Sequence, residues 1–181
     1  RTACVNMGIS CGLSAPYVAG QLDFAISTAA SSRASPPRYA AVAIGFNPAA
    51  LSRDAPVAGL SCGGSFRDIC TALTQPSEDP TRPSPHALVN PVVGPEAVAG
   101  SSRMKGGSAT LAIADAIAYR ATRIVAGEDA RDAPTIAQCV GRAHEAYRCT
   151  YLQARAIASV CELAAGAMRR GGRLYYVGEG S

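Results

Sequence analysis

An alternation of apolar strand, helix and apolar strand occupies the first 46 residues of the chain. The run TACVNMGIS at 2–10 is short and apolar, and the run YAAVAIGF at 39–46 is apolar almost without interruption. Between them, Pro16 suits the first turn of a helix, and apolar residues then recur at helical spacing as far as Ala29. Uninterrupted apolar strands are typical of a parallel sheet covered on both faces. The pattern predicts an α/β fold with a doubly wound parallel sheet.

The rest of the chain is predicted to be mainly helical. After a short helix within 63–75, three segments carry apolar residues on one face and start near Arg103, Pro134 and Ala154. A Gly-Gly pair ends the last of them, and the run RLYYVG at 173–178 then predicts a strand. A helical connection therefore leads from one α/β unit to the beginning of another. Because the chain opens on Arg1 and stops just after a strand, we expect it to be a fragment.

Composition excludes several classes of protein. Apolar residues make up 48% of the 181 residues and charged residues 17%, which excludes a disordered chain. The net charge is +4, but the arginines are scattered and tryptophan is absent, which argues against a nucleic-acid partner. Seven cysteines without a CxxC pair predict neither a metal site nor a disulfide scaffold, and favour a reducing, intracellular location. No leader and no long apolar run is visible, so the sequence predicts no membrane association.

Two strand-to-helix turns could carry chemistry. The first is SCGLSAP at 10–16, where free backbone amides and the helix dipole would favour a phosphate. Gly12 would let the backbone approach a ligand, while Ser10 and Ser14 could donate hydrogen bonds to phosphate or sugar oxygens. The alternative is an ordinary turn with Ser14 as the helix N-cap.

The second turn is GSSRMK at 100–105. Arg103 and Lys105 fall in the first turn of the following helix, where cations oppose the helix dipole unless an anion lies nearby. Such a conflict is typical of functional sites. The alternative is a serine N-cap with solvated basic side chains. Glu96 could contact a sugar or act as a base, but a solvated or capping carboxylate is the favoured interpretation, and His144 is expected on a helix surface.

Four segments together resemble the family of glucokinase regulatory proteins. They are GLSAPYVAGQLD at 12–23, GFNPAALSRDAP at 45–56, LVNPVVGPEAVAGSSRMKGGSAT at 88–110 and LYYVGEGS at 174–181. The wider superfamily is built from sugar isomerase (SIS) domains and includes the N-acetylmuramic acid 6-phosphate etherases. The etherases have a Ser-Gly-Arg-Thr-Pro-like first turn and read Met-Lys-Ala-Gly-Thr in the second. This chain differs at both places, which favours the regulatory family.

The resemblance implies a domain organisation. Residues 1–60 would be the C-terminal half of a first SIS domain. Residues 61–172 would hold a connecting loop, the second phosphate-contacting turn and the helices, and residues 173–181 would begin a second SIS domain. A fructose phosphate would lie between the two domains. The matching positions that would bind it are Ser10, Gly12, Ser14, Ser101 and Ser102, with Lys105 as a supporting charge.

The resemblance also implies a function. The protein would bind fructose 6-phosphate or fructose 1-phosphate and inhibit a glucokinase- or hexokinase-type enzyme in the cytoplasm and nucleus, with no catalytic residues and no cofactor. The alternative is an enzyme, either an etherase that removes lactate from N-acetylmuramic acid 6-phosphate by general acid-base chemistry or another SIS-fold sugar-phosphate enzyme. The glutamates of such an etherase would lie upstream of this sequence.

Overall fold

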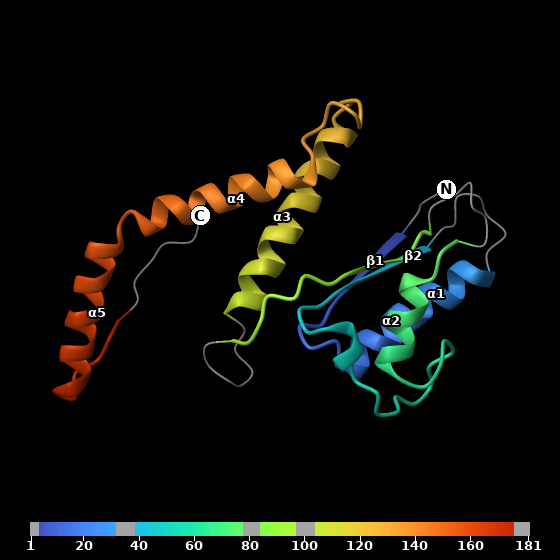
Figure 1. Cartoon of the computed structure of the whole chain (residues 1–181), viewed down its shortest axis with the longest axis horizontal. Coiled ribbons are helices and arrows are strands. Elements are labelled where there is room, and N and C mark those ends of the chain that lie inside the picture. The colour runs from blue at the N-terminus through green and yellow to red at the C-terminus, as the bar shows by residue number, and fades with distance from the viewer. Residues whose placement is uncertain (1–3, 32–38, 78–83, 97–103, 176–181) are drawn as a thin grey trace. The chain divides into compact units, whose positions relative to one another are not determined.

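The computed structural model describes residues 4–31, 39–77, 84–96 and 104–175 of the chain (Figure 1). The chain divides into two compact units, Arg1–Leu111 and Ala112–Ser181. The first unit is an α/β unit and the second is helical, and each is described by itself below.

A three-stranded parallel sheet forms the centre of the first unit. Strands β1 (Cys4–Ile9), β2 (Tyr39–Ile44) and β3 (Ala87–Val89) lie in the order β1-β2-β3. The β1–β2 register places Gly8 opposite Ala43, and the β2–β3 register places Ile44 opposite Val89. The predicted α/β fold with a parallel sheet is thus confirmed, and β1 and β2 lie within the predicted runs. The sequence analysis missed β3, because a three-residue strand is too short to show periodicity.

Helices α1 (Pro16–Ser31) and α2 (Phe66–Thr74) pack against one face of this sheet (Figure 1). Gly8 lets α1 approach closely, since a Cβ atom at this position would lie 2.8 Å from the Val18 side chain. The core on this face is made of fully buried apolar residues from strands and helices, namely Leu22, Ala25, Ala41, Ala43, Phe66 and Ile69. Most of these side chains are small or branched, as the alanine-rich strands require.

The opposite face of β1 is open within the described part of the chain. Val5, Met7 and Ile9 point away from α1 and are 61%, 37% and 41% exposed. The expectation of a sheet covered on both faces is therefore not met for β1 by the described residues. An uninterrupted apolar run predicts that both faces of a strand can be buried. It does not identify which element covers each face.

Asp23 fixes α1 to the loop before α2. Its carboxylate is 5% exposed and accepts hydrogen bonds from the backbone N–H groups of Ser61 (2.9 Å) and Cys62 (2.7 Å). Burial alone would raise the pKa of Asp23, but these hydrogen bonds outweigh it and lower the pKa. Burial first, and then the neighbouring carboxylate, raise the pKa of the Cys62 thiol to about 11. Asp23 therefore remains ionised and has a structural role.

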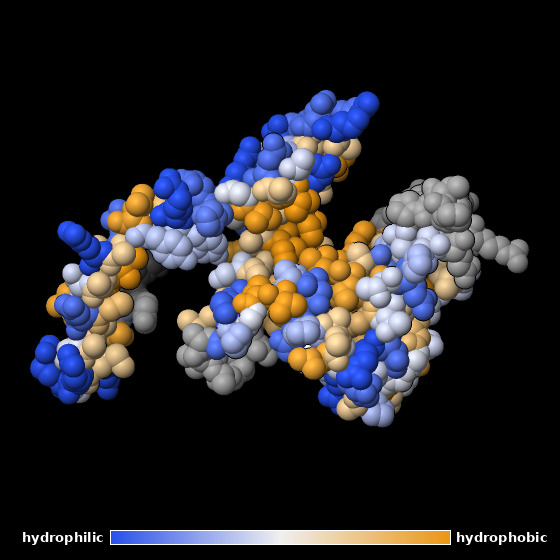
Figure 2. Space-filling model, in the orientation of Figure 1, coloured by the Kyte–Doolittle hydropathy of each residue, from blue (hydrophilic) through white to orange (hydrophobic). Residues whose placement is uncertain are grey.

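The second unit contains the remaining helices. Helix α3 (Lys105–Val125) begins in the first unit, and α4 (Ile136–Tyr151) and α5 (Ala154–Arg169) follow. Arg120 on α3 donates hydrogen bonds to the carbonyl oxygens of Ala130 and Ala133, which fixes the connection to α4. No residue of α5 is buried, and its apolar residues Ile157, Val160 and Leu163 are exposed (Figure 2).

The predicted helices agree with these observations, with starts and ends that differ by a few residues. The predicted strand at 173–178 is not observed in 173–175, and the rest of it lies outside the described residues. Among the described helices, none has the length and apolar character needed to cross a bilayer. All seven cysteines are free, and Cys4, Cys149 and Cys161 are exposed.

His86 extends the pairing between β2 and β3. Its Nδ1 atom accepts a hydrogen bond from the backbone N–H of Ala41 (3.1 Å), in the place that a strand carbonyl would otherwise take. This interaction needs a neutral imidazole, because a protonated Nδ1 cannot accept. Burial lowers the pKa of His86 below its ordinary value. No partner for His86 was visible in the sequence, since the acceptor role depends on a residue 45 positions away.

We therefore expect stability to fall as the pH drops below about 6.5, the ordinary pKa of histidine. The folded state binds the His86 proton more weakly than the unfolded state, so each pH unit below this value costs at most about 1.4 kcal/mol. Denaturant unfolding between pH 7.5 and 5.5 would measure this loss. His86→Asn keeps an acceptor near the same place and should remove part of the pH dependence. His144→Asn, on the exposed surface of α4, is the matched control. Equal pH profiles for wild type and His86→Asn would contradict the assignment.

Candidate functional site

The candidate site lies where the strands of the first unit end. Strand β1 leads into the turn 10–15, β2 into 45–48, and β3 into the segment that begins at Asn90. In parallel sheets, ligands bind beyond the carboxyl ends of the strands. The first predicted turn is located at this edge, as expected for residues that directly follow β1.

Ser10 organises the first turn from within. It is 7% exposed, and its Oγ accepts hydrogen bonds from the backbone N–H groups of Ser14 (3.0 Å) and Ala15 (3.3 Å). Its own carbonyl oxygen accepts from Leu13 N–H (2.8 Å). Ser10 thus satisfies the two amides that precede α1, and no hydrogen bond among the described residues makes Ser14 the helix N-cap.

Leu13 holds the turn in an uncommon backbone conformation. It has a φ of 50° and is fully buried, and its carbonyl oxygen accepts from Arg53 N–H (3.0 Å). The Leu13 side chain occupies the space above Gly45, where a Cβ atom would overlap it and would lie 2.9 Å from the Ser10 carbonyl oxygen. The strained conformation persists because burial of Leu13 compensates for it.

Four residues form what we call the Gly12 corner, namely Cys11, Gly12, Ser14 and Asn47. A Cβ atom on Gly12 would lie 3.2 Å from Ser14 Oγ and 3.6 Å from Asn47 Nδ2. Ser14 and Asn47 are exposed. In the part of the chain that the structure describes, the backbone N–H groups of Cys11 and Gly12 donate to no other protein group. The corner therefore presents hydrogen-bond donors that the fold itself does not use.

Asparagine side chains and amides connect the loops at this edge. Asn90 Nδ2 donates to the carbonyl oxygens of Gly45 and Asn47, both at 2.8 Å. The carbonyl oxygen of Cys11 accepts from the N–H groups of Phe46 (2.8 Å) and Asn47 (3.2 Å). The ends of all three strands are thereby held together without any ligand. Sequence reasoning did not identify Asn47 or Asn90, although an Asn-Pro pair follows β2 and β3 in both cases.

Glu96 caps the first turn of α3. Its carboxylate accepts hydrogen bonds from the backbone N–H groups of Met104 (3.1 Å), Lys105 (2.8 Å) and Gly106 (2.9 Å). These are the amides that a helix N-terminus leaves without a partner. The capping interpretation of Glu96 is thus confirmed. The Glu96 carboxylate thus supplies the negative charge that was expected near the basic residues of this turn.

The first turn of α3 lies against the β1–α1 turn. Gly106 is buried, and a Cβ atom there would lie 3.3 Å from Phe46 Cδ2 and 3.5 Å from Cys11 Sγ. The two segments that the sequence singled out therefore meet at Gly106. Lys105 is exposed, and its Nζ lies 3.5 Å from the Cβ position of Gly94. Ser101 and Ser102 lie outside the described residues.

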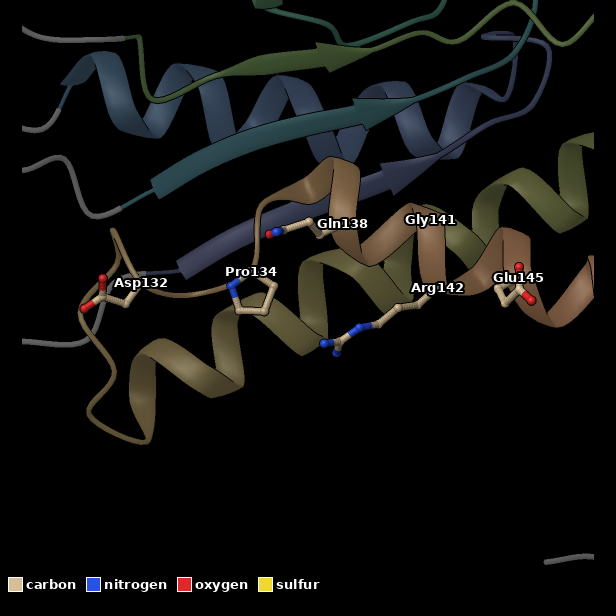
Figure 3. Close-up of a pocket in the computed structure, with 6 residues that line it drawn as sticks. All are labelled: Asp132, Pro134, Gln138, Gly141, Arg142 and Glu145. Atoms are coloured by element: carbon tan, nitrogen blue, oxygen red, sulfur yellow. The ribbon is translucent and has the colours of Figure 1, made fainter.

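A second candidate is a surface cavity of about 450 Å³ beside α4 in the helical unit (Figure 3). Asp132 and Glu145 lie at opposite ends of its row of lining residues, with Arg142 between them (Figure 3). Arg142 donates to Tyr119 Oη (2.6 Å) and lies over the Tyr119 ring, at 5.1 Å from its centroid. A hydrogen bond from Arg148 lowers the pKa of Glu145. Arg142 and Glu145 are thus engaged with other residues of the unit, which leaves Asp132 as the charged lining residue whose side chain has no partner among the described residues. We also find no cluster of metal-ligating side chains in the described ranges.

Comparisons with known proteins identify related sequences. No family model matches the chain. It is 36% identical over 179 residues to the glucokinase regulatory protein of Xenopus laevis and 31% identical over 174 residues to that of Homo sapiens. These alignments cover 97% and 96% of the chain and 26% of each relative. The chain is homologous to a stretch of the glucokinase regulatory proteins. It spans about a quarter of the length of these relatives.

We expect Glu96→Ala to loosen the first turn of α3. Loss of the carboxylate leaves three amides without an acceptor and should lower the free energy of unfolding by about 1–3 kcal/mol. Hydrogen exchange at the amides of Met104, Lys105 and Gly106 should become faster. Glu96→Gln should have a smaller effect, because one oxygen can still accept. Glu162→Ala, at an exposed position of α5, is the control. Unchanged exchange in Glu96→Ala would show that the cap does not order this turn.

Proposed function

We propose that this chain contributes part of a sugar-phosphate site in a regulatory protein that inhibits a glucokinase- or hexokinase-type enzyme. The proposal is carried by the homology to glucokinase regulatory proteins, together with the Gly12 corner at the carboxyl edge of the sheet. In this proposal the α/β unit is the later half of one SIS domain, residues 61–172 form the connection, and 173–181 begin a second SIS domain.

The chemistry of the Gly12 corner suits a phosphate. Two consecutive backbone N–H groups, at Cys11 and Gly12, accompany the Ser14 hydroxyl next to the N-terminus of α1. Consecutive amides near a helix N-terminus favour an anion through both hydrogen bonds and the helix dipole. Gly12 has no side chain to obstruct the approach of an oxygen to these amides. We therefore assign phosphate contact to Gly12 and Ser14, with Ser10 holding their backbone in place.

Ser101, Ser102 and Lys105 complete the proposed site. The Glu96 carboxylate already occupies the amides at 104–106, so a ligand would compete with it if it bound there. The proposed contribution of this turn is therefore the serine hydroxyls and the Lys105 charge. Gly106, the residue that follows Lys105, lies close to Cys11 of the first turn, since a Cβ atom on Gly106 would be 3.5 Å from Cys11 Sγ.

Ligand binding could regulate a partner only if the ligand prefers one conformation of the protein. A ligand shifts an equilibrium by no more than its difference in affinity for the two states. We propose that fructose 6-phosphate selects the conformation that binds the kinase. In this view the sugar phosphate is an effector, and the chain supplies contacts to it and no catalytic group.

The experiment that tests this function uses the intact protein and isothermal titration calorimetry with fructose 6-phosphate. Saturable binding, with altered inhibition of glucokinase at the same concentrations, is the expected result. The same protein incubated with N-acetylmuramic acid 6-phosphate should release no lactate at enzyme-like rates. Lactate release would instead support the etherase alternative and overturn the regulatory role.

We further expect Ser14→Ala combined with Ser102→Ala to weaken fructose 6-phosphate binding. A lost hydrogen bond to a charged phosphate costs about 1.5–3 kcal/mol, which corresponds to about 10- to 100-fold in affinity for each contact. Ser159→Ala removes a hydroxyl that bonds within α5 and should leave the affinity unchanged. Thermal unfolding of each variant checks the fold. If the double variant has wild-type affinity, these hydroxyls do not contact the ligand.

A further inference from the structure

Hydrogen bonds fix the backbone of Asn47, whereas its side chain makes none to the described residues. Its N–H donates to the Cys11 carbonyl oxygen (3.2 Å), and its carbonyl oxygen accepts from Asn90 Nδ2 (2.8 Å). The following Pro48 further restricts its conformation. The exposed side-chain amide makes no hydrogen bond to the described residues. The fold therefore holds this carboxamide in position without using it.

A local structural role does not account for the side chain. Asparagine before a helix commonly caps it, and the 3₁₀ helix η1 (Ala49–Leu51) begins two residues later. Its N-terminal residue is Pro48, however, and no side chain caps it. The two bonds that fix Asn47 use backbone atoms, which any residue other than proline provides. The role of the side-chain amide must therefore be sought in the groups that it faces.

The amide faces the Gly12 corner with its donor end. Nδ2 is the Asn47 atom nearest to the Cβ position of Gly12, at 3.6 Å, and Ser14 Oγ lies 3.2 Å from the same position. The Cys11 and Gly12 amides are the other donors there. Side chains that follow two different strands, Ser14 after β1 and Asn47 after β2, thus lie near the same position. A set of donors matches an oxyanion better than a sugar hydroxyl, which also needs an acceptor.

We propose that Asn47 is a further ligand-binding residue, and that its Nδ2 donates a hydrogen bond to a phosphate oxygen of the sugar phosphate. This inference rests on the proposed function and adds a contact from the β2 loop to those of the β1–α1 turn. The inference also requires a neutral side chain at position 47, because a carboxylate there would repel a phosphate held by the neighbouring amides.

The test compares Asn47→Ala and Asn47→Asp in the intact protein by calorimetry with fructose 6-phosphate. Asn47→Ala should weaken binding about 10-fold or more, and Asn47→Asp should weaken it further. Both variants should keep the wild-type melting temperature, since the side chain makes no bond within the described fold. Gln21→Glu introduces the same change of charge on the exposed surface of α1 and should bind as wild type does.

Each outcome separates this inference from the proposed function. If wild type binds and Ser14→Ala weakens binding, but both Asn47 variants bind within about two-fold of wild type, Asn47 is not a ligand and only this inference fails. If wild-type protein binds no fructose 6-phosphate, both proposals fail. A loss in Asn47→Asp alone, with Asn47→Ala unchanged, would show repulsion without a native hydrogen bond and would also overturn the inference.

Discussion

The contact between Leu13 and Gly45 is the constraint on which the carboxyl edge of the sheet depends. Leu13 is buried at a positive φ, directly above a residue that has no side chain. Any larger residue at 45 would push Leu13 and the Ser10 carbonyl oxygen away from β2. The Ser10 cap and the Cys11 hydrogen bonds would then lose their geometry. The position of the Gly12 corner is therefore set by packing beneath it, before any ligand is bound.

Side chains of the protein already satisfy several amides at this edge. The Ser10 hydroxyl accepts from the amides that precede α1, and the Glu96 carboxylate accepts from those that begin α3. A site that relied on these amides would have to break existing hydrogen bonds to receive a phosphate. The amides of Cys11 and Gly12 carry no such cost. Ligand contact is therefore better assigned to the amides of Cys11 and Gly12 than to the amides that Ser10 and Glu96 already occupy.

Much of the local structure could be predicted from sequence, whereas the long-range hydrogen bonds could not. Pro16 and the spacing of Leu22 and Ile26 were sufficient to predict α1, because a helix is determined by neighbouring residues. His86 and Asn90, by contrast, accept from or donate to residues 45 or 43 positions away. Such partners become visible only when the strands are paired. The SIS interpretation and its serine contacts remain predictions.

The two charges at the start of α3 act in opposite directions on an anionic ligand. Glu96 compensates for the helix dipole, because its carboxylate lies on the three amides that concentrate the positive end. The ammonium group of Lys105 is exposed and is therefore not needed to balance a buried anion in its own turn. Loss of Glu96 would leave these amides without their acceptor and would make the potential at this turn more positive, because a negative charge is removed while Lys105 stays. The Glu96 cap therefore orders the helix start and at the same time weakens the attraction of Lys105 for a phosphate.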